Sequence, residues 1–309
     1  MPEKQGTRAP APPGEYMLLV LLAILWGGSF TLIKVAVADY PPATLAAARI
    51  LLGGALLTAL ALAKGFTLPT RPGRWGALWV QGLLQGALPF TLIGWGEQHI
   101  ASGLAGVLNA TVPLFAFMLS VFVVGSAPFV FTKFVGVLLG LAGVAGIAGL
   151  GSHAALGGSD FLAVMAVLGA SASYACGAVF GHRFGDQPAV VTAAGSLLCG
   201  GLTMLPFSLA MDRPWTLTPS LEATLALLAL AVLSTALASV IFFRLIRTLG
   251  PVTTTSNAYL RALVSVAFGV VFLAEPLSWS LLAASALIVA GVMLVTLPGR
   301  PDGELRRAG

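Results

Sequence analysis

Residues 17–37 read MLLVLLAILWGGSFTLIKVAV, and Lys34 carries the only charge among them. A helix of this length rises about 30 Å, which matches the hydrocarbon core of a bilayer. The run is longer than the apolar part of a secretory signal peptide, and its leader carries acidic as well as basic residues. We therefore interpret it as a membrane-spanning helix.

Nine further apolar runs follow, at residues 43–63, 75–96, 102–124, 129–150, 161–181, 189–211, 221–243, 253–272 and 279–296. Of the 309 residues, 58% are hydrophobic and only 9% are charged, whereas about a quarter of a soluble protein is charged. Barrel strands alternate over about 10 residues, but these runs are continuously apolar over about 20. The sequence predicts an all-α membrane protein with ten transmembrane helices.

The basic residues orient these helices in the bilayer. With a cytoplasmic amino terminus, twelve of the sixteen Lys and Arg residues fall in cytoplasmic segments and only Arg213 falls outside. Basic residues are enriched on the cytoplasmic side of membranes. We expect residues 1–16 and 299–309 to be cytoplasmic tails, with the bilayer and not nucleic acid as the partner of these charges.

The chain also contains an internal repeat. Without a gap, a shift of 148 residues lays Asn109-Ala110 on Asn257-Ala258, Pro128 on Pro276, and Ala142-Gly143-Val144 on Ala290-Gly291-Val292. The predicted repeats cover residues 17–150 and 151–298, with five helices each.

An odd number of helices forces the second copy to enter the membrane from the opposite side. The two copies are then related by a pseudo-two-fold axis in the membrane plane, an arrangement typical of secondary transporters. In such proteins a site near the midplane opens alternately to each side. A duplicated membrane scaffold or sensor that does not transport is the alternative.

The order of several short motifs resembles the EamA branch of the drug/metabolite transporter (DMT) superfamily. The resemblance implies an inner-membrane carrier, often an exporter of amino acids or other small metabolites, with a central cavity lined by both halves. The motifs are Trp26-Gly27, Pro41-Pro42 followed by Arg49, the run Asn109 to Pro113, Phe242-Phe243-Arg244, Gly250-Pro251, Tyr259-Leu260 and Glu275-Pro276.

The sequence departs from the family pattern at two positions. The family usually has a Glu after the fourth helix of each half, but the first-half counterpart of Glu275 is Ala127. The family also usually has a proline where Arg261 stands, as Pro113 stands in the first half. The centre of the second half is therefore unusual.

Arg261 is the first candidate for substrate binding. It lies about 12 Å into the hydrocarbon core, where a lipid-facing Arg is costly, so it should face the protein interior. Thr254, Asn257 and Ser265 recur with it at helical spacing and draw one polar stripe. The stripe indicates either the wall of a substrate cavity or a structural polar seam.

Two kinds of acceptor are open to the Arg261 guanidinium, because no acidic residue is expected at its depth. One is a substrate carboxylate, held bidentately. The other is a set of backbone carbonyls freed near Pro89 or Pro113, which are also candidate hinges because proline removes a helix hydrogen bond.

The remaining candidates each have a structural alternative. Arg49 could contact substrate or donate hydrogen bonds to loop carbonyls. Trp26 and Tyr174, which the repeat relates, could stack on substrate or pack in the core. Gln81, Gln85 and Asn109 could hydrogen-bond a substrate or neighbouring helices. Glycines spaced by four, such as Gly82 and Gly86, are expected to let helices approach closely.

Enzyme signatures are not found in the sequence. It has no H-E-x-x-H, G-x-S-x-G or P-loop motif, and its three histidines lack metal-ligand spacing, so we expect no metal or cofactor. An intramembrane enzyme is the third alternative. We expect a secondary active or facilitative carrier that exports a small metabolite. Proton coupling stays open, because every acid lies in a loop, a tail or near a helix end. A homodimer is also possible.

Overall fold

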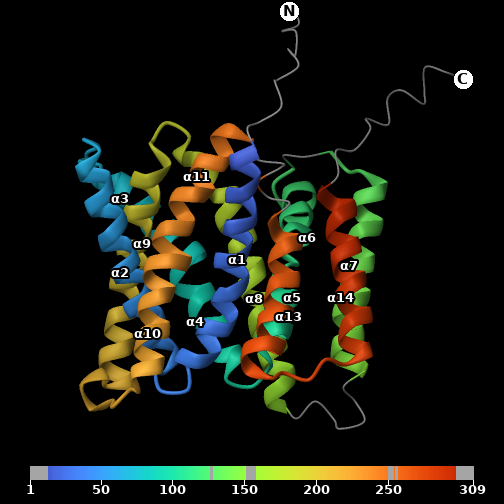
Figure 1. The fold of residues 1–309 in the computed structure, drawn as a ribbon. Helices are drawn as coiled ribbons and strands as arrows, with labels where there is room; N and C mark the ends of the chain where they lie inside the picture. The colour runs from blue at the N-terminus through green and yellow to red at the C-terminus, as the bar shows by residue number, and fades with distance from the viewer. Residues whose placement is uncertain (1–12, 126–127, 151–157, 250–253, 255–256, 297–309) are drawn as a thin grey trace, which may run out of the picture.

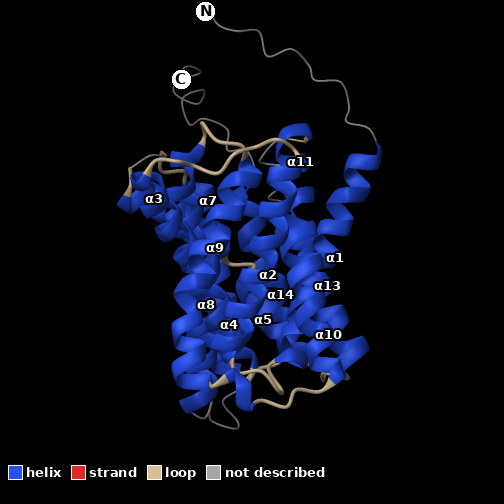
Figure 2. Cartoon of the chain, turned by 90° about the vertical axis from the view of Figure 1, so that its left-hand side faces the viewer, coloured by secondary structure: helices blue, strands red, loops and turns tan. Residues whose placement is uncertain are grey.

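A computed structural model describes residues 13–125, 128–150, 158–249, 254 and 257–296. In this part of the chain all regular structure is helical and no strand occurs (Figure 2). Seven helices are long and apolar enough to cross a membrane, and three shorter apolar helices accompany them in the described residues. The prediction of an all-α protein with ten membrane spans is confirmed.

The first half contains five spans. They are formed by α1 (Pro13–Ala36); α2 (Pro42–Ala63); α3 (Pro72–Gly82), η1 (Leu83–Ala87) and α4 (Leu88–Glu97); α5 (Ser102–Asn109), α6 (Val112–Met118) and η2 (Leu119–Val123); and α7 (Phe131–Leu150).

The second half repeats this order. Its spans are formed by α8 (Gly158–Gly181); α9 (Ala189–Phe207) and η4 (Ser208–Asp212); α10 (Leu221–Ala229), η6 (Leu230–Leu237) and α11 (Ala238–Thr248); α13 (Asn257–Leu273); and α14 (Trp279–Thr296). The short helices η3 (His182–Phe184) and η5 (Pro214–Thr216) follow the first and second of these spans.

The two halves run in opposite directions through the bundle. α1 begins at the end of the bundle that we call the Pro13 end, at the top of Figure 1, and α2 begins at the other end, which we call the Pro42 end. α8 finishes at the Pro13 end, because Asp186 just after it pairs with Arg74 at the start of α3. α8 therefore crosses opposite to α1, its counterpart, as the inverted repeat requires.

Helix packing follows the same symmetry. α2 packs on α9, and α7 packs on α14 as a pair at one side of the bundle (Figure 1). The contact of α1 with α13 has its counterpart in that of α8 with α5 and α6, and the contact of α4 with α8 in that of α10 with α1. The third span of each half also contains a wide π-helical segment, η1 and η6, at equivalent positions.

Glycines bring several of these helices into close contact. A Cβ atom placed on Gly82 of α3 would lie 2.1 Å from the carbonyl oxygen of Ser196 on α9. Likewise, a Cβ on Gly291 of α14 would lie 2.4 Å from the Gly136 oxygen on α7. Only glycine permits backbones this near. Close approach is therefore found at Gly82, as its spacing predicted, but not at Gly86, where a Cβ would meet nothing nearer than 3.6 Å.

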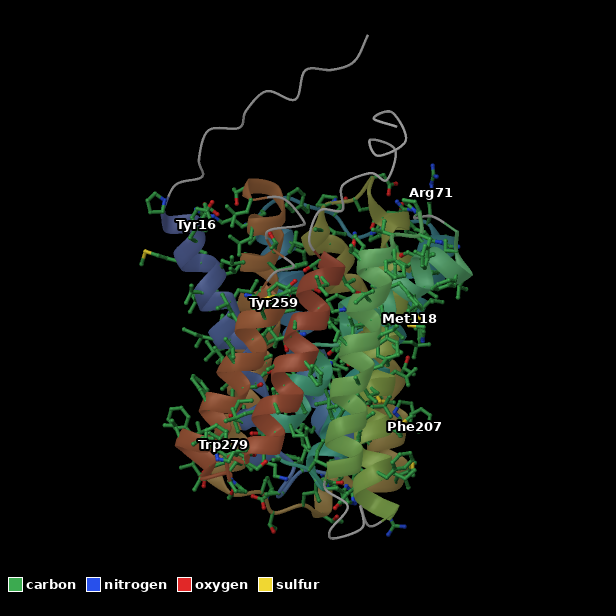
Figure 3. The ribbon with its side chains drawn as sticks, turned by 90° about the vertical axis from the view of Figure 1, so that its right-hand side faces the viewer. Tyr16, Arg71, Met118, Phe207, Tyr259 and Trp279 are labelled. Carbon is green, nitrogen blue, oxygen red and sulfur yellow. The ribbon has the colours of Figure 1, made fainter. Side chains whose placement is uncertain are left out.

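Side chains on the outside of the bundle suit a bilayer. Many large hydrophobic residues point outward, and Trp279 is 87% exposed. Figure 3 shows Tyr16 and Arg71 at one end, and Trp279 and Phe207 toward the opposite end. Aromatic side chains near both ends are typical of the two membrane–water interfaces.

The spans are less regular than a continuous apolar run suggests. The fourth span breaks between Asn109 and Val112, and the third changes to π-helical geometry before Leu88. A proline follows each irregularity and explains it, because proline has no N–H to donate the hydrogen bond that would continue the preceding turn. The ninth run was predicted at residues 253–272, but only residues 254 and 257–272 of it are described.

Candidate functional site

Arg261 lies where the two halves meet, since α13 packs against both α1 and α5. Its Nη2 donates to the backbone oxygen of Asn109 at 3.4 Å, which is a long hydrogen bond. Its Nε is buried and has no hydrogen-bond partner among the described residues. A guanidinium has five N–H donors, so contacts with the described chain use only part of its capacity.

The acceptor for Arg261 is the end of a helix. α5 stops at Asn109, and Pro113 lies in the first turn of α6. The Gly106, Val107 and Leu108 oxygens accept hydrogen bonds from the N–H groups of Ala110 and Thr111, but Pro113 has no N–H to donate to the Asn109 oxygen four residues before it. The Asn109 side chain points elsewhere and donates to Ser171 Oγ on α8 at 3.3 Å. One of the two acceptors predicted for Arg261, a freed carbonyl near Pro113, is thus present.

Arg49 reaches from α2 into the second half and is only 5% exposed. Its Nε donates to Thr235 Oγ1 in η6 at 2.9 Å, and its guanidinium carbon lies 4.0 Å from the centre of the Phe90 ring. The described hydrogen bond is therefore to a hydroxyl group of the π-helical segment and not to a loop carbonyl.

Tyr174 on α8 lies within electrostatic range of both arginines. Its half-buried phenol interacts electrostatically with both guanidinium groups, and its ring meets Phe90 edge-on, with centroids 6.5 Å apart. Gln85 Nε2 donates to the Tyr174 backbone oxygen at 3.1 Å. We call Arg49, Gln85, Phe90, Asn109, Tyr174 and Arg261 the central cluster. It combines two cations with two aromatic rings, which suits an anion that carries an apolar group.

Trp26 has a different environment from Tyr174, its counterpart in the repeat. Its Nε1 donates to the Ser234 backbone oxygen at 3.2 Å, and its ring centre lies 5.3 Å from that of Phe242. The indole N–H is thus satisfied by the protein. These contacts are those expected of core packing, and a role for Trp26 in stacking on substrate stays a prediction.

The other polar candidates lie outside the central cluster. Asn257 donates to the Leu19 backbone oxygen at 2.9 Å, and its Oδ1 has no partner among the described residues. Ser265 donates within its own helix, and Thr254 is buried. Gln81 is buried beside Gly181. A role for these four in substrate binding stays a prediction.

Both candidate hinges adjoin irregular backbone. Pro89 follows the π-helical segment η1, and Pro113 follows the break between α5 and α6. Irregularities of this kind often mark places where a helix bends. Movement at either proline stays a prediction.

Glu275 joins the two halves at the Pro42 end. Its carboxylate accepts hydrogen bonds from the backbone N–H groups of Ser102 at 2.6 Å and Gly103 at 2.9 Å. It therefore caps the positive end of α5. Its first-half counterpart, Ala127, lies outside the described residues.

Replacing Glu275 with Ala should lower the stability of the folded protein by about 1 to 2 kcal/mol, because two backbone donors lose a charged acceptor. Thermal unfolding in detergent measures the change. Glu222→Ala, at an exposed acid in the first turn of α10, is the control and should have a much smaller effect. Equal effects of both substitutions would contradict the capping role.

Sequence analysis did not single out Glu97, which the structure buries completely at the end of α4. Neither carboxyl oxygen has a hydrogen-bond partner among the described residues. Lys34 Nζ lies nearby but donates to the backbone oxygens of Glu97 and Ile100. Its position at the end of a span gave no sign of this burial, which depends on packing by other helices.

Two hollows lie away from the central cluster. One, of about 260 Å³, is almost wholly apolar and is lined by Val107 and by residues of α13 and α14 between Ala262 and Val289. The other, of about 700 Å³, lies at the Pro13 end and is lined by Arg71, Arg74 and Arg183. Neither includes a residue of the central cluster.

Comparison with known proteins gives consistent results. The EamA-like transporter family matches residues 14–149 and again residues 161–297. The chain is 34% identical over 282 residues to the uncharacterized inner membrane transporter YedA of Escherichia coli (strain K12), covering 90% of this chain and 89% of YedA. It is 26% identical over 287 residues to a probable terminal-alkyne amino-acid exporter of Streptantibioticus cattleyicolor, covering 90% and 91% of the two chains.

A solved crystal structure shares the fold. It superposes with a TM-score of 0.67 at 20% sequence identity, covering 96% of this chain and 98% of the other.

Proposed function

Because this chain belongs to the EamA-like transporter family, we propose that it exports a small carboxylate metabolite, such as an amino acid, by alternating access. It is a multi-pass inner-membrane transporter and not an enzyme. The substrate class, the direction of transport and the mechanism go beyond this family-level function and are the parts that we propose.

The buried Nε of Arg261, which has no partner among the described residues, carries the proposal. An incompletely satisfied guanidinium inside a bundle favours a carboxylate ligand, since the two groups form parallel charge-assisted hydrogen bonds. The Asn109 carbonyl at 3.4 Å would compete weakly with such a ligand.

The aromatic rings define the rest of the proposed substrate. Phe90 and Tyr174 adjoin the cations and offer apolar surface to a substrate side chain. A carboxylate that carries an apolar group would use both features. The relative named as a probable amino-acid exporter is consistent with this class.

Hydrogen bonds between the halves at both ends support alternating access. At the Pro13 end, Arg244 Nη2 on α11 donates to Glu15 on α1 at 2.7 Å. At the Pro42 end, the backbone N–H of Thr44 on α2 donates to Asp212 at 2.8 Å. We propose that each set breaks in turn, while Pro89 and Pro113 allow the third and fourth spans to bend.

Counterflow in proteoliposomes tests the mechanism. Unlabelled substrate inside the vesicles should accelerate uptake of the labelled substrate, because a loaded site returns to the outside faster than an empty one. Uptake that is indifferent to internal substrate would indicate a channel and contradict alternating access.

The proposed orientation places both termini in the cytoplasm, on the basis of the basic residues at the Pro13 end. Reporter fusions after Gly65 and after Arg300 should be active in the cytoplasm, and a fusion after Ser152 should be active outside. A cytoplasmic signal from the Ser152 fusion would overturn this orientation.

A further inference from the structure

We propose that Glu97 is the proton-binding site of this transporter, and that a proton on its carboxyl group travels with the carboxylate substrate. This inference rests on the proposed function, because it needs a carboxylate in the central cluster. It starts from the burial and surroundings of the Glu97 side chain.

Glu97 is fully buried, and both of its carboxyl oxygens lack a hydrogen-bond partner among the described residues. An unpaired carboxylate is strongly disfavoured in such a place, whereas a neutral carboxyl group is tolerated. The structure therefore fits the protonated form.

The cations near Glu97 are engaged elsewhere. Lys34 Nζ donates to two backbone oxygens, and Arg49 Nε donates to Thr235 while its guanidinium covers Phe90. Lys34, Arg49 and the acidic Glu275 all act electrostatically on Glu97. The titratable groups on elements around α4 are Lys34 on α1, Arg49 on α2, Asp160 and Tyr174 on α8, and Glu275 after α13, with the exposed His99 following α4 itself.

Arg49 connects Glu97 to the central cluster through α4: its guanidinium carbon lies 4.0 Å from the centre of the Phe90 ring, and Phe90 precedes Glu97 by about two turns of the same helix. If Glu97 loses its proton to water, its charge attracts Arg49 away from the central cluster. A bound substrate carboxylate attracts Arg49 in the other direction and repels the Glu97 charge. Substrate binding and proton binding therefore favour each other, and this coupling is reciprocal.

The transport step then moves both ligands together. Glu97 is closed off from water in this structure, so transport requires a movement of the bundle that lets its carboxyl group take a proton on the side where substrate binds and release it on the side where substrate leaves. A proton that leaves with an exported substrate moves against an inward proton gradient, so the outward substrate gradient must drive net export.

Infrared spectroscopy tests the proton site without a substrate. At neutral pH, wild type should show the C=O band of a protonated carboxyl group that Glu97→Gln lacks and the control Glu275→Gln retains. Identical spectra for wild type and Glu97→Gln would overturn the inference, whatever the transport activity.

Transport assays with a pool of radiolabelled neutral L-amino acids test the coupling. At pH values where Glu97 loses its proton, wild-type counterflow should fall about tenfold per pH unit, as for a single titrating group. Substrate efflux should also remove protons from the vesicle lumen and make it alkaline. Glu97→Gln should exchange substrate without proton movement, and its rate should vary with pH less than about twofold. Wild-type transport without proton movement would overturn this inference and leave the proposed function standing, whereas the absence of wild-type transport of this pool would overturn both.

Discussion

Arg261→Gln should reduce transport of carboxylate substrates by about 10- to 100-fold, because it removes the charge and one of two parallel hydrogen bonds to the carboxylate. Arg261→Lys should also weaken transport, since it keeps the charge but loses the planar fork. Initial rates of counterflow at several substrate concentrations measure both variants.

A folding defect would produce the same loss of transport, so stability must be measured in parallel. Both Arg261 variants should insert and unfold like wild type, because the guanidinium has only a long hydrogen bond to Asn109 among the described residues. Wild-type rates and affinities in both variants would show that Arg261 is structural.

Gly82→Ala should destabilise the folded bundle by at least about 3 kcal/mol, at the upper end of the cost of overpacking. The added methyl group would lie 2.1 Å from the Ser196 carbonyl oxygen and 2.7 Å from the Gly200 nitrogen. Both are backbone atoms, so relief requires α3 and α9 to separate. The change is measured as the loss of monodisperse protein and a lower unfolding temperature in detergent.

Gly86→Ala is the matched control in the same span. A Cβ atom at Gly86 would meet nothing nearer than Ile50 Cδ1, at 3.6 Å. This is an ordinary van der Waals distance, so we expect little change in stability. Because Ala has a higher helix propensity than Gly, propensity cannot destabilise either variant, and equal destabilisation by both would show that the contact with α9 does not determine the effect.

The fold was predictable because its signals are local or periodic. The length of each apolar run defined the spans, and the constant shift that lays Asn109 on Asn257 defined the repeat. Both signals can be found without knowing how the helices pack. Glycine spacing predicted close helix contact at Gly82 for the same reason.

The site was predictable only in part. A charge deep in a span must face inward, so Arg261 could be placed in the interior from its position alone. The Arg49 hydrogen bond to Thr235 joins residues that are 186 positions apart, and the burial of Glu97 depends on helices distant in sequence. Trp26 and Tyr174 occupy equivalent positions but have different neighbours, which sequence symmetry does not reveal.

Ligand-dependent unfolding of the wild-type protein tests the central claim most directly. A ligand that binds the native state stabilises it by RT ln(1 + [L]/Kd) and so raises its unfolding temperature as the ligand concentration rises. Apolar amino acids should stabilise wild type, and the matching amino-acid amides, which lack the carboxylate, should not. Equal stabilisation by acids and amides, or by amides alone, would contradict a carboxylate site at Arg261.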